Sequence, residues 1–269
     1  MYLVRKQLPG YCKFLLLIIT VCFSAAVKAN TNKVKPEFYQ IRIYHFRDSA
    51  QEKILDTYLQ NAFLPAIHKA GINKAGIFKA IANDTAADKL LYVFITLKST
   101  EHLLKLSQQL GADAVYQAAA RDYIDAAYKN PPYSRMESIL LKAFSLAPQM
   151  QIPGLKALLN ERIYELRSYE SATEKKYRNK VQMFNEGGEI NLFKRLDFNA
   201  VFYAEVISGS HMPNLMYMTS FENKTVRDAH WKAFGEAPEW KKLSSLPEYQ
   251  DNVSHIDIVF LRATAYSDF

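Results

Sequence analysis

Two six-residue segments, 125 positions apart, hold the side chains best suited to chemistry. They are Tyr39–Tyr44 (YQIRIY) and Tyr164–Tyr169 (YELRSY). Side chains alternate between the two faces of a strand. Each segment therefore separates an arginine, a tyrosine and one amide or acid from its aliphatic neighbours. The arginine-bearing sets are Gln40, Arg42 and Tyr44 in the first segment, and Glu165, Arg167 and Tyr169 in the second.

We expect the aliphatic sets to lie under helices and the arginine-bearing sets to point into a barrel. Tyr203 and Glu205 alternate on a later strand and could point the same way. A buried arginine must be paired, and Glu165 and Glu205 are available. If Arg42 lacks an acid in its own unit, a ligand or Glu165 must supply one. Two interpretations stay open: a pocket in which Arg42 or Arg167 holds a ligand carboxylate, or a satisfied polar network.

An aromatic cluster near the end of the chain gives further candidates. It contains His230, Trp231, Phe234 and Trp240. The cluster forms either a lip over the barrel mouth or the packing of the last helix on its neighbours. His230, like His45 at the end of the first strand, could be a haem ligand or a general base. The alternative is an ordinary surface or core histidine.

Several kinds of site are absent from the sequence pattern. None of the 6 histidines pairs with another at the i+3 or i+4 spacing of helical metal sites, so we predict no metal site. No phosphate-binding glycine loop or serine nucleophile elbow appears, and we expect no cofactor. Both cysteines, Cys12 and Cys22, lie in a predicted leader, which leaves no thiol chemistry for the rest of the chain.

The elements that must position these residues occur twice. The run Leu91–Ser99 (LYVFITLKS) matches Leu215–Asn223 (LMYMTSFEN), and Ile139–Ala143 matches Val259–Ala263. After each opening strand, Ser49 and Ser171 begin the patterns SAQE and SATE, which we interpret as capping boxes at helix starts. The repeat places a first unit at 36–146, a linker at 147–160 and a second unit at 161–269.

Each unit has the order strand, helix, strand, strand, helix, strand, which is the ferredoxin-like pattern. The predicted strands are 38–46, 76–82, 90–97, 136–144, 162–169, 199–207, 214–221 and 255–263. The predicted helices are 50–70, kinked at Pro65, and 100–128, 172–185, 189–195, 223–235 and 239–246. Such a sheet carries its helices on one face and leaves the other bare. We therefore predict an α+β fold in which two tandem βαββαβ units form a dimeric α/β barrel-like arrangement within one chain.

Residues 1–29 have the pattern of a signal peptide. Basic residues precede the apolar run Phe14–Phe23, and Val27–Ala29 offers a cleavage site after Ala29. The run is short for a membrane span, although an uncleaved anchor is the alternative. Cleavage would remove four basic residues and lower the net charge from +7 to +3. So small a charge gives no case for nucleic acid. We expect a secreted or periplasmic protein without stable membrane insertion.

The second segment resembles the opening strand of the NIPSNAP family. The run His230–Phe234 and the following Pro238–Lys241 (PEWK) resemble the same family. The stretch Pro131–Ser138 resembles its secreted bacterial two-domain members. The resemblance implies the dimeric α/β barrel fold, which small cofactor-independent monooxygenases share, and implies no established activity.

Three functions remain open from the sequence. The first is an exported binding or interaction protein, with a small-molecule pocket between the two sheets and a possible homo-oligomeric state. The second is a cofactor-independent monooxygenase or isomerase that acts on a small aromatic or quinone-like compound. The third is haem binding through His45 or His230. Whether the protein is an enzyme is left open.

Overall fold

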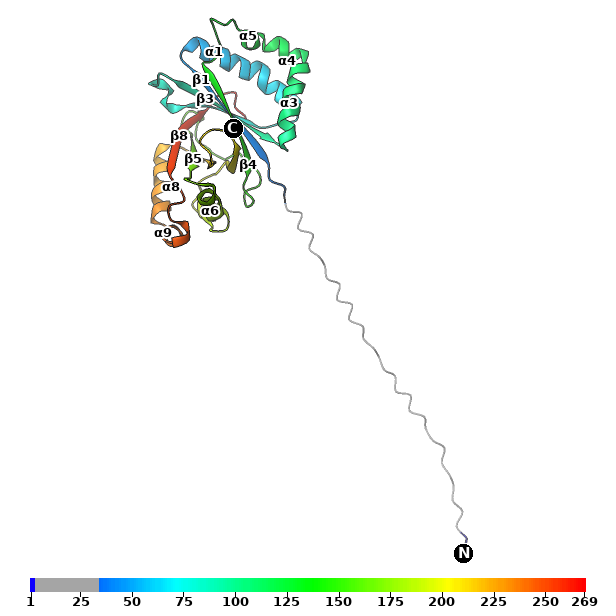
Figure 1. Cartoon of the computed structure of the whole chain (residues 1–269), viewed down its shortest axis with the longest axis vertical. Helices are drawn as coiled ribbons and strands as arrows, with labels where there is room; N and C mark the ends of the chain where they lie inside the picture. Colours follow the sequence, from blue (N-terminus) through cyan, green and yellow to red (C-terminus); the bar gives the residue numbers. More distant parts are fainter. Residues whose placement is uncertain (3–33) are drawn as a thin grey trace. The chain divides into compact units, whose positions relative to one another are not determined.

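The two repeats predicted from the sequence together form one closed barrel of eight antiparallel strands (Figure 1). The computed structural model describes residues 1–2 and 34–269, so the predicted leader, apart from its first two residues, lies outside the described residues. The strands are β1 (Phe38–Phe46), β2 (Ala75–Ala80), β3 (Lys89–Leu97), β4 (Arg135–Ala143), β5 (Ile163–Glu170), β6 (Phe202–Ser208), β7 (Asn214–Phe221) and β8 (His255–Ala263).

Each repeat contributes one four-stranded sheet. The first sheet has the order β4-β1-β3-β2 and the second has the equivalent order β8-β5-β7-β6. Two seams join the sheets: Phe78–Ala80 of β2 pairs with β8, and Leu140–Ala143 of β4 pairs with β6. Closure removes the unpaired edges that would otherwise invite association. The predicted α+β fold of two ferredoxin-like units in a barrel is confirmed.

The helices cover the outside of the strands. Figure 1 shows α1, α3, α4 and α5 of the first repeat on one side, and α6, α8 and α9 of the second repeat on the other. Their bounds are α1 (Ser49–Tyr58), α2 (Leu64–Lys69), α3 (Thr100–Ala112), α4 (Ala114–Ala119), α5 (Arg121–Ile124), α6 (Glu174–Asn185), α7 (Glu189–Arg195), α8 (Lys224–Glu236) and α9 (Pro238–Ser244). No described helix combines the length and the apolar composition that a membrane crossing requires.

Local signals differ from the predicted ones at the helix starts. Asp48, not Ser49, caps α1, because its side chain accepts from the backbone N–H groups two and three residues on. Thr173, not Ser171, caps α6. The Ser171 hydroxyl instead donates to the carbonyl of Asn252 at 2.7 Å. In both cases an oxygen-bearing residue next to the predicted cap supplies the acceptor.

The first predicted helix is interrupted near its proline. A π-helical turn, Leu59–Phe63, separates α1 from α2 and ends two residues before Pro65. Proline lacks the N–H that would continue the regular ladder, which accounts for the local change in winding. Gly71 follows α2 with a φ of +87°, as the predicted helix end requires.

The barrel interior is filled by apolar side chains from both sheets. Phe94 stacks on Phe202 with ring centroids 4.8 Å apart, and Tyr39 tilts against both rings. At the end where β1 and β5 begin, Phe269 packs on Phe78 and Phe94, and linker residue Met150 joins the same cluster. That end is therefore closed by aromatic and linker residues.

Candidate ligand-binding site

The structure reverses the predicted facing of the first strands. Tyr39 and Ile41 of β1, like Tyr164 and Leu166 of β5, lie in the barrel interior. Tyr44 and Tyr169 instead pack against the helices. The prediction that the arginine-bearing sets point into the barrel is wrong. The reason is that both faces of β5 are covered, so alternation alone could not say which face meets which layer.

Glu165 is the centre of an ionic network between β5 and α8. Its carboxylate has no exposed surface and accepts from Arg167 at 2.6 and 2.7 Å. Arg227 donates to both of its oxygens at 2.7 Å, and the indole N–H of Trp231 donates at 2.9 Å. The Arg167 guanidinium also lies 3.7 Å from the centre of the Trp231 ring. This part of the predicted site is a satisfied polar network.

The two guanidinium groups of this network favour the charged form of Glu165. Burial alone would raise the pKa of Glu165, but the hydrogen bonds from Arg227 and the charge of Arg167 lower it below its ordinary value. Arg167 also donates to the hydroxyl of Tyr169 at 3.1 Å, which meets the hydroxyl of Tyr217 at 2.8 Å. Each of the three guanidinium nitrogens of Arg167 thus contacts a partner inside the fold.

The remaining predicted residues of the second repeat lie apart. Tyr203 packs beside Tyr217 in the helix-side core, and Glu205 accepts from Tyr177 at 3.0 Å. These two line surface hollows of about 570 and 450 Å³, respectively. His230 contacts Phe198 and Phe221 edge-on. The aromatic cluster therefore packs on the helix side of the sheet, away from a barrel mouth.

The first repeat holds a different version of the same face. Gln40 stands where the second repeat has Glu165, and its side chain accepts from Arg42 at 3.1 Å while donating to Ser138 at 2.7 Å. Among the described residues, no carboxylate forms an ion pair with half-buried Arg42. Its guanidinium lies 4.9 Å from the centre of the Phe63 ring. Neither Glu165 nor another acid among the described residues forms an ion pair with Arg42.

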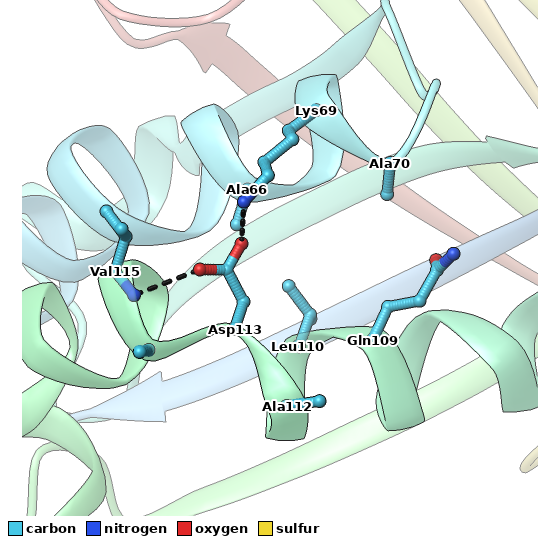
Figure 2. A pocket seen from close by; sticks show the side chains of 9 residues that line it. Ala66, Lys69, Ala70, Gln109, Leu110, Ala112, Asp113 and Val115 are labelled. Carbon is cyan, nitrogen blue, oxygen red and sulfur yellow. Dashed lines mark hydrogen bonds and ion pairs between the residues drawn. The ribbon is translucent and has the colours of Figure 1, made fainter.

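One large surface hollow, between α2 and the α3–α4 corner, carries little chemistry (Figure 2). Its volume is about 500 Å³ and its walls are mostly alanine and aliphatic side chains. Its charged side chains, Lys69 and Asp113, pair with each other at 2.7 Å. Asp113 is also the cap of α4, bonded to the N–H of Val115. Both charges are thus already used within the fold.

A smaller cavity opens at the barrel end where β1 and β5 finish. Its volume is about 220 Å³. Its walls are apolar side chains from both sheets, namely Ile43, Ile139, Leu166, Met216 and Val259. Polar groups converge on the same space, namely Ser168, Asn214, Glu137, Asp257 and His211. Apolar walls with a few convergent polar groups are the usual makeup of a ligand site. We call this cavity and its rim the barrel mouth.

Charged and titratable side chains gather at the rim. They are His45, His211 and His255 with Asp88, Glu137, Glu170 and Asp257. The histidines come from β1, β8 and the β6–β7 loop, so their convergence is invisible to local spacing. Below them, burial and the charges of Glu137 and Asp257 raise the pKa of Tyr92, which keeps its phenol protonated as a hydrogen-bond donor.

In the first-repeat half of the rim, one histidine lies between two acids. His45 lies between Asp88 at 2.7 Å and Glu137 at 2.9 Å. Burial alone would lower the pKa of His45, but the hydrogen bonds to these two carboxylates raise it above its ordinary value. The two carboxylates therefore stabilise the imidazolium form of His45.

The second-repeat half carries two acids at the equivalent positions. Glu170 on β5 corresponds to His45 on β1, and Asp257 on β8 corresponds to Glu137 on β4. The described residues place no lysine or arginine nitrogen within 4.0 Å of either carboxylate. Their near neighbours are exposed histidines: His211 lies 2.9 Å from Glu170, and His255 lies 3.0 Å from Asp257.

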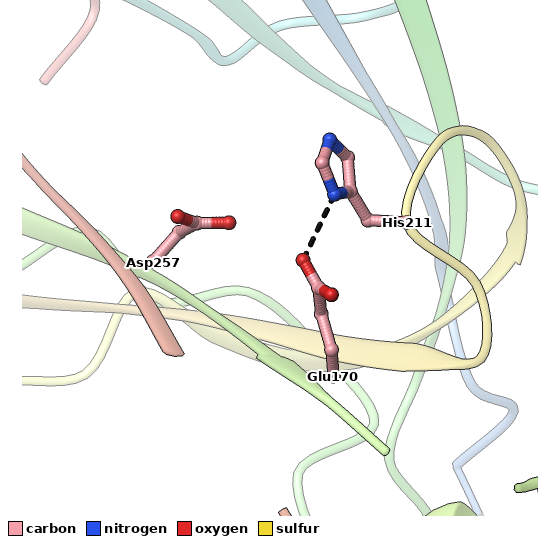
Figure 3. A group of neighbouring side chains, drawn as sticks. All are labelled: Glu170, His211 and Asp257. Atoms are coloured by element: carbon pink, nitrogen blue, oxygen red, sulfur yellow. Dashed lines mark ion pairs between the residues drawn. The ribbon is translucent and has the colours of Figure 1, made fainter. Parts of the chain in front are cut away.

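Glu170, His211 and Asp257 form the group in this half that could hold a metal ion (Figure 3). One ligand atom from each residue lies within 4.8 Å of the other two. Figure 3 shows the His211 ring directed at the Glu170 carboxylate and Asp257 on β8 across from both. His211 belongs to the β6–β7 loop and has a φ of +63°, which is uncommon for a side chain of this size.

Sequence reasoning missed the barrel mouth, although part of the signal was available. With the facing of β5 assigned correctly, Ser168 and Glu170 would have been placed on the barrel face by alternation with Leu166. The same rule places Asp257 on that face of β8 with Val259. His211 has no such signal, because it lies in a loop outside any strand period.

Comparison with known proteins identifies a sequence family that matches part of the chain and solved structures that share its fold. The sequence model of the NIPSNAP family matches residues 164–268, which lie in the second repeat. No curated protein sequence matches the chain.

Three solved structures share the fold over most of their length. A candidate monooxygenase from Lactobacillus acidophilus aligns with a TM-score of 0.53 and 11% identity, covering 85% of this chain and 94% of that one. A candidate monooxygenase from Fusobacterium nucleatum aligns with a TM-score of 0.52 and 8% identity, covering 85% and 93%. An anthrone oxidase-like protein aligns with a TM-score of 0.50 and 9% identity, covering 86% and 92%. At these identities the likeness shows the fold alone.

Proposed function

Because the second repeat of this chain belongs to the NIPSNAP family, we propose that the protein is a small-molecule-binding protein whose ligand enters the barrel mouth. The observation that carries this proposal is the cavity of about 220 Å³, in which apolar walls meet convergent polar groups. Its small volume suits a compact ligand with an apolar body and a polar end. The apolar part would contact Leu166 and Val259, and the polar end would face Ser168 and the rim.

Binding without turnover agrees with the state of the other polar groups. The Glu165 network is saturated by Arg167, Arg227 and Trp231. Burial and the charges of Glu137 and Asp257 raise the pKa of Tyr92 beneath the rim, so its phenol is available as a hydrogen-bond donor to a ligand.

The test is retention of a small molecule by the purified protein. Native mass spectrometry of the wild type should show a bound mass that denaturation releases, and small-molecule spectrometry identifies it. Val259→Phe, which fills the mouth, should lose this mass. The matched control is Ile190→Phe, a half-buried residue in the hollow beside the linker, which should retain it. Equal loss from both variants, or retention by Val259→Phe, would contradict the proposal.

A second candidate function is cofactor-independent oxidation of a small aromatic or quinone-like compound. It is supported by the shared fold with two candidate monooxygenases and an anthrone oxidase-like protein. Oxygen uptake in the presence of the released ligand or of simple quinols tests it. Uptake that Val259→Phe abolishes would favour turnover over binding alone.

Haem binding receives less support from the two histidines considered for it. Both ring nitrogens of His45 contact carboxylates, and His230 lies among aromatic rings on the helix side. A haem is larger than the mouth cavity. A Soret band on haem titration remains the measurement that would revive this function.

Export is part of the same proposal. The leader pattern supports cleavage after Ala29 and work in the periplasm or outside the cell. N-terminal sequencing of the processed protein should begin at Asn30. A first residue of Met1 on membrane-bound protein would favour the uncleaved anchor instead.

A further inference from the structure

We propose that the second-repeat half of the barrel mouth binds a divalent cation through Glu170, His211 and Asp257. The inference builds on the proposed function by placing the ion at the same mouth, where a ligand's polar end could reach it. One imidazole nitrogen and two carboxylates form a mixed ligand set, which suits Zn²⁺ or Mn²⁺.

The first support is the difference between the two halves of the rim at equivalent strand positions. In the first repeat these positions hold His45 and Glu137, and the two ring nitrogens of His45 already contact Asp88 and Glu137 at 2.7 and 2.9 Å. In the second repeat both positions are acids, Glu170 and Asp257. Two carboxylates close together on one rim repel each other, and a divalent cation between them would relieve this repulsion.

The second support is geometric. The three ligand atoms already lie within 4.8 Å of one another. Because Zn²⁺ bonds such atoms at about 2.0–2.2 Å, two ligand atoms of one ion lie at most about 4.4 Å apart. The side chains of His211 and Asp257 are 62% and 49% exposed, so they can rotate by the small amount needed. Glu170, with 21% exposure, is the fixed member of the set.

The third support is unused hydrogen-bonding capacity next to this set. Asn214 lines the cavity and pairs with Glu170 across the strands. It is 2% exposed, and its amide donates to Ser168 at 2.8 Å. Its Oδ1 has no partner among the described residues. A buried oxygen of this kind is costly, and a water molecule bound to the ion would donate to it.

Glu170 also has a side-chain oxygen without a hydrogen-bond partner in the described part of the chain. Its Oε1 is buried and lies 2.9 Å from Nδ1 of His211, but the contact lacks the alignment of a hydrogen bond. A carboxylate oxygen and an imidazole nitrogen that lie this close without a hydrogen bond between them are both available to an ion.

The experiment measures binding of the metal alone to the full purified protein. After treatment with EDTA and its removal, the protein is titrated with Zn²⁺ and with Mn²⁺ by calorimetry, and bound metal is counted after dialysis. The wild type should bind one ion per chain and melt at a higher temperature with the ion present. Asp257→Asn and His211→Gln should each weaken binding by about tenfold or more.

The control is Glu239→Gln, which alters an exposed carboxylate paired with Arg195, outside the barrel mouth. Its metal affinity should stay within about twofold of the wild type. Absence of saturable binding, or an equal loss in Glu239→Gln and Asp257→Asn, would overturn the metal site. Circular dichroism of each variant shows that the fold is kept. A small molecule that stays bound to EDTA-treated protein would keep the proposed function while the metal site fails.

Discussion

Arg42 and Arg167 occupy equivalent positions on β1 and β5, yet their surroundings differ in charge. Arg167 is neutralised two residues back on its own strand by Glu165, which also holds Arg227 from α8. Arg42 meets the neutral amide of Gln40 at that position. One carboxylate in place of one amide thus ties β5 to α8, a connection that the first repeat lacks.

The comparison shows that the two repeats are alike on the barrel side of the sheet and differ on the helix side and at the rim. Barrel-side positions near the closed end keep matching aromatic and aliphatic residues, such as Tyr39 and Tyr164. The helix-side face and the rim have diverged in charge. The shared residues hold the sheets together, and the divergent ones give each half its own electrostatics.

The largest expected effect comes from separating the repeats. A chain of residues 34–147 would expose the barrel face of its sheet, including Tyr39 and Phe94, and leave β2 and β4 as open edges. We expect it to dimerise or aggregate, because each sheet is covered by the other. Light scattering after size exclusion measures this. A folded, soluble monomer would show that the two faces do not depend on each other.

A single charge tests the helix-side comparison. Glu165→Gln copies the first repeat and removes the carboxylate that pairs with the buried Arg167 and the half-buried Arg227. We expect a loss of about 3–5 kcal/mol in the free energy of unfolding, measured by urea denaturation. As a control, Glu239→Gln removes an exposed partner of Arg195 and should cost about 1 kcal/mol or less. A similar small cost for both would mean that the network adds little to stability.

The reverse exchange, Gln40→Glu, gives Arg42 the carboxylate that it lacks. Because Arg42 is only half-buried, we expect a gain of about 0–1 kcal/mol in the same unfolding measurement. The hydroxyl of Ser138 can turn to donate to the new carboxylate. A loss as large as that of Glu165→Gln would show that the first-repeat face cannot accept a charge at all.

Lowering the pH tests the same comparison between Glu165 and the neutral amide. The pKa of Glu165 is lowered from 4.5, so its contribution to stability is present above pH 4.5 and is lost as the pH falls through the lowered value. The difference in unfolding free energy between the wild type and Glu165→Gln should therefore shrink below pH 4.5. Urea midpoints across this range measure it. A constant difference would place the effect in packing and not in charge.

The smallest expected effect concerns the rim. Since the pKa of His45 is raised above 6.5, the stability it contributes is complete below pH 6.5 and is lost as the pH rises through the raised value. The flanking acids are partly exposed, so the contribution should be about 1 kcal/mol or less. NMR titration should give His45 a pKa above 6.5, and a lower one in Glu137→Gln. No difference between the two would contradict the interaction of His45 with Glu137.

Much of the fold followed from the sequence because repetition is a long-range signal that local errors do not erase. The match between Leu91–Ser99 and Leu215–Asn223 aligned the strands that became β3 and β7. The helix caps were missed by one or two residues, since Asp48 and Thr173 can accept the same bonds as the neighbouring serines. The π-helical turn before Pro65 was not predicted, because no hydrophobic periodicity in the sequence marks such a turn.

The site was harder to predict because its residues meet only through closure of the barrel. Glu170 was omitted after the facing of β5 was reversed, and Arg227 was overlooked as the second partner of Glu165. His211 and Asp257 lie 46 positions apart in the sequence and on different elements. Helical spacing of histidines is a test for sites built on one helix, and it does not detect ligands brought together by three separate segments.

Closure within one chain also changes what the mouth can recognise. Equivalent positions of the two repeats, such as Ile43 and Ser168, face each other across the same cavity. If two identical subunits formed this barrel, every substitution at the rim would appear twice and the opening would stay symmetric. Because the two repeats are fused in one chain, each side of the opening can mutate independently. This opening can therefore distinguish the two ends of an asymmetric molecule.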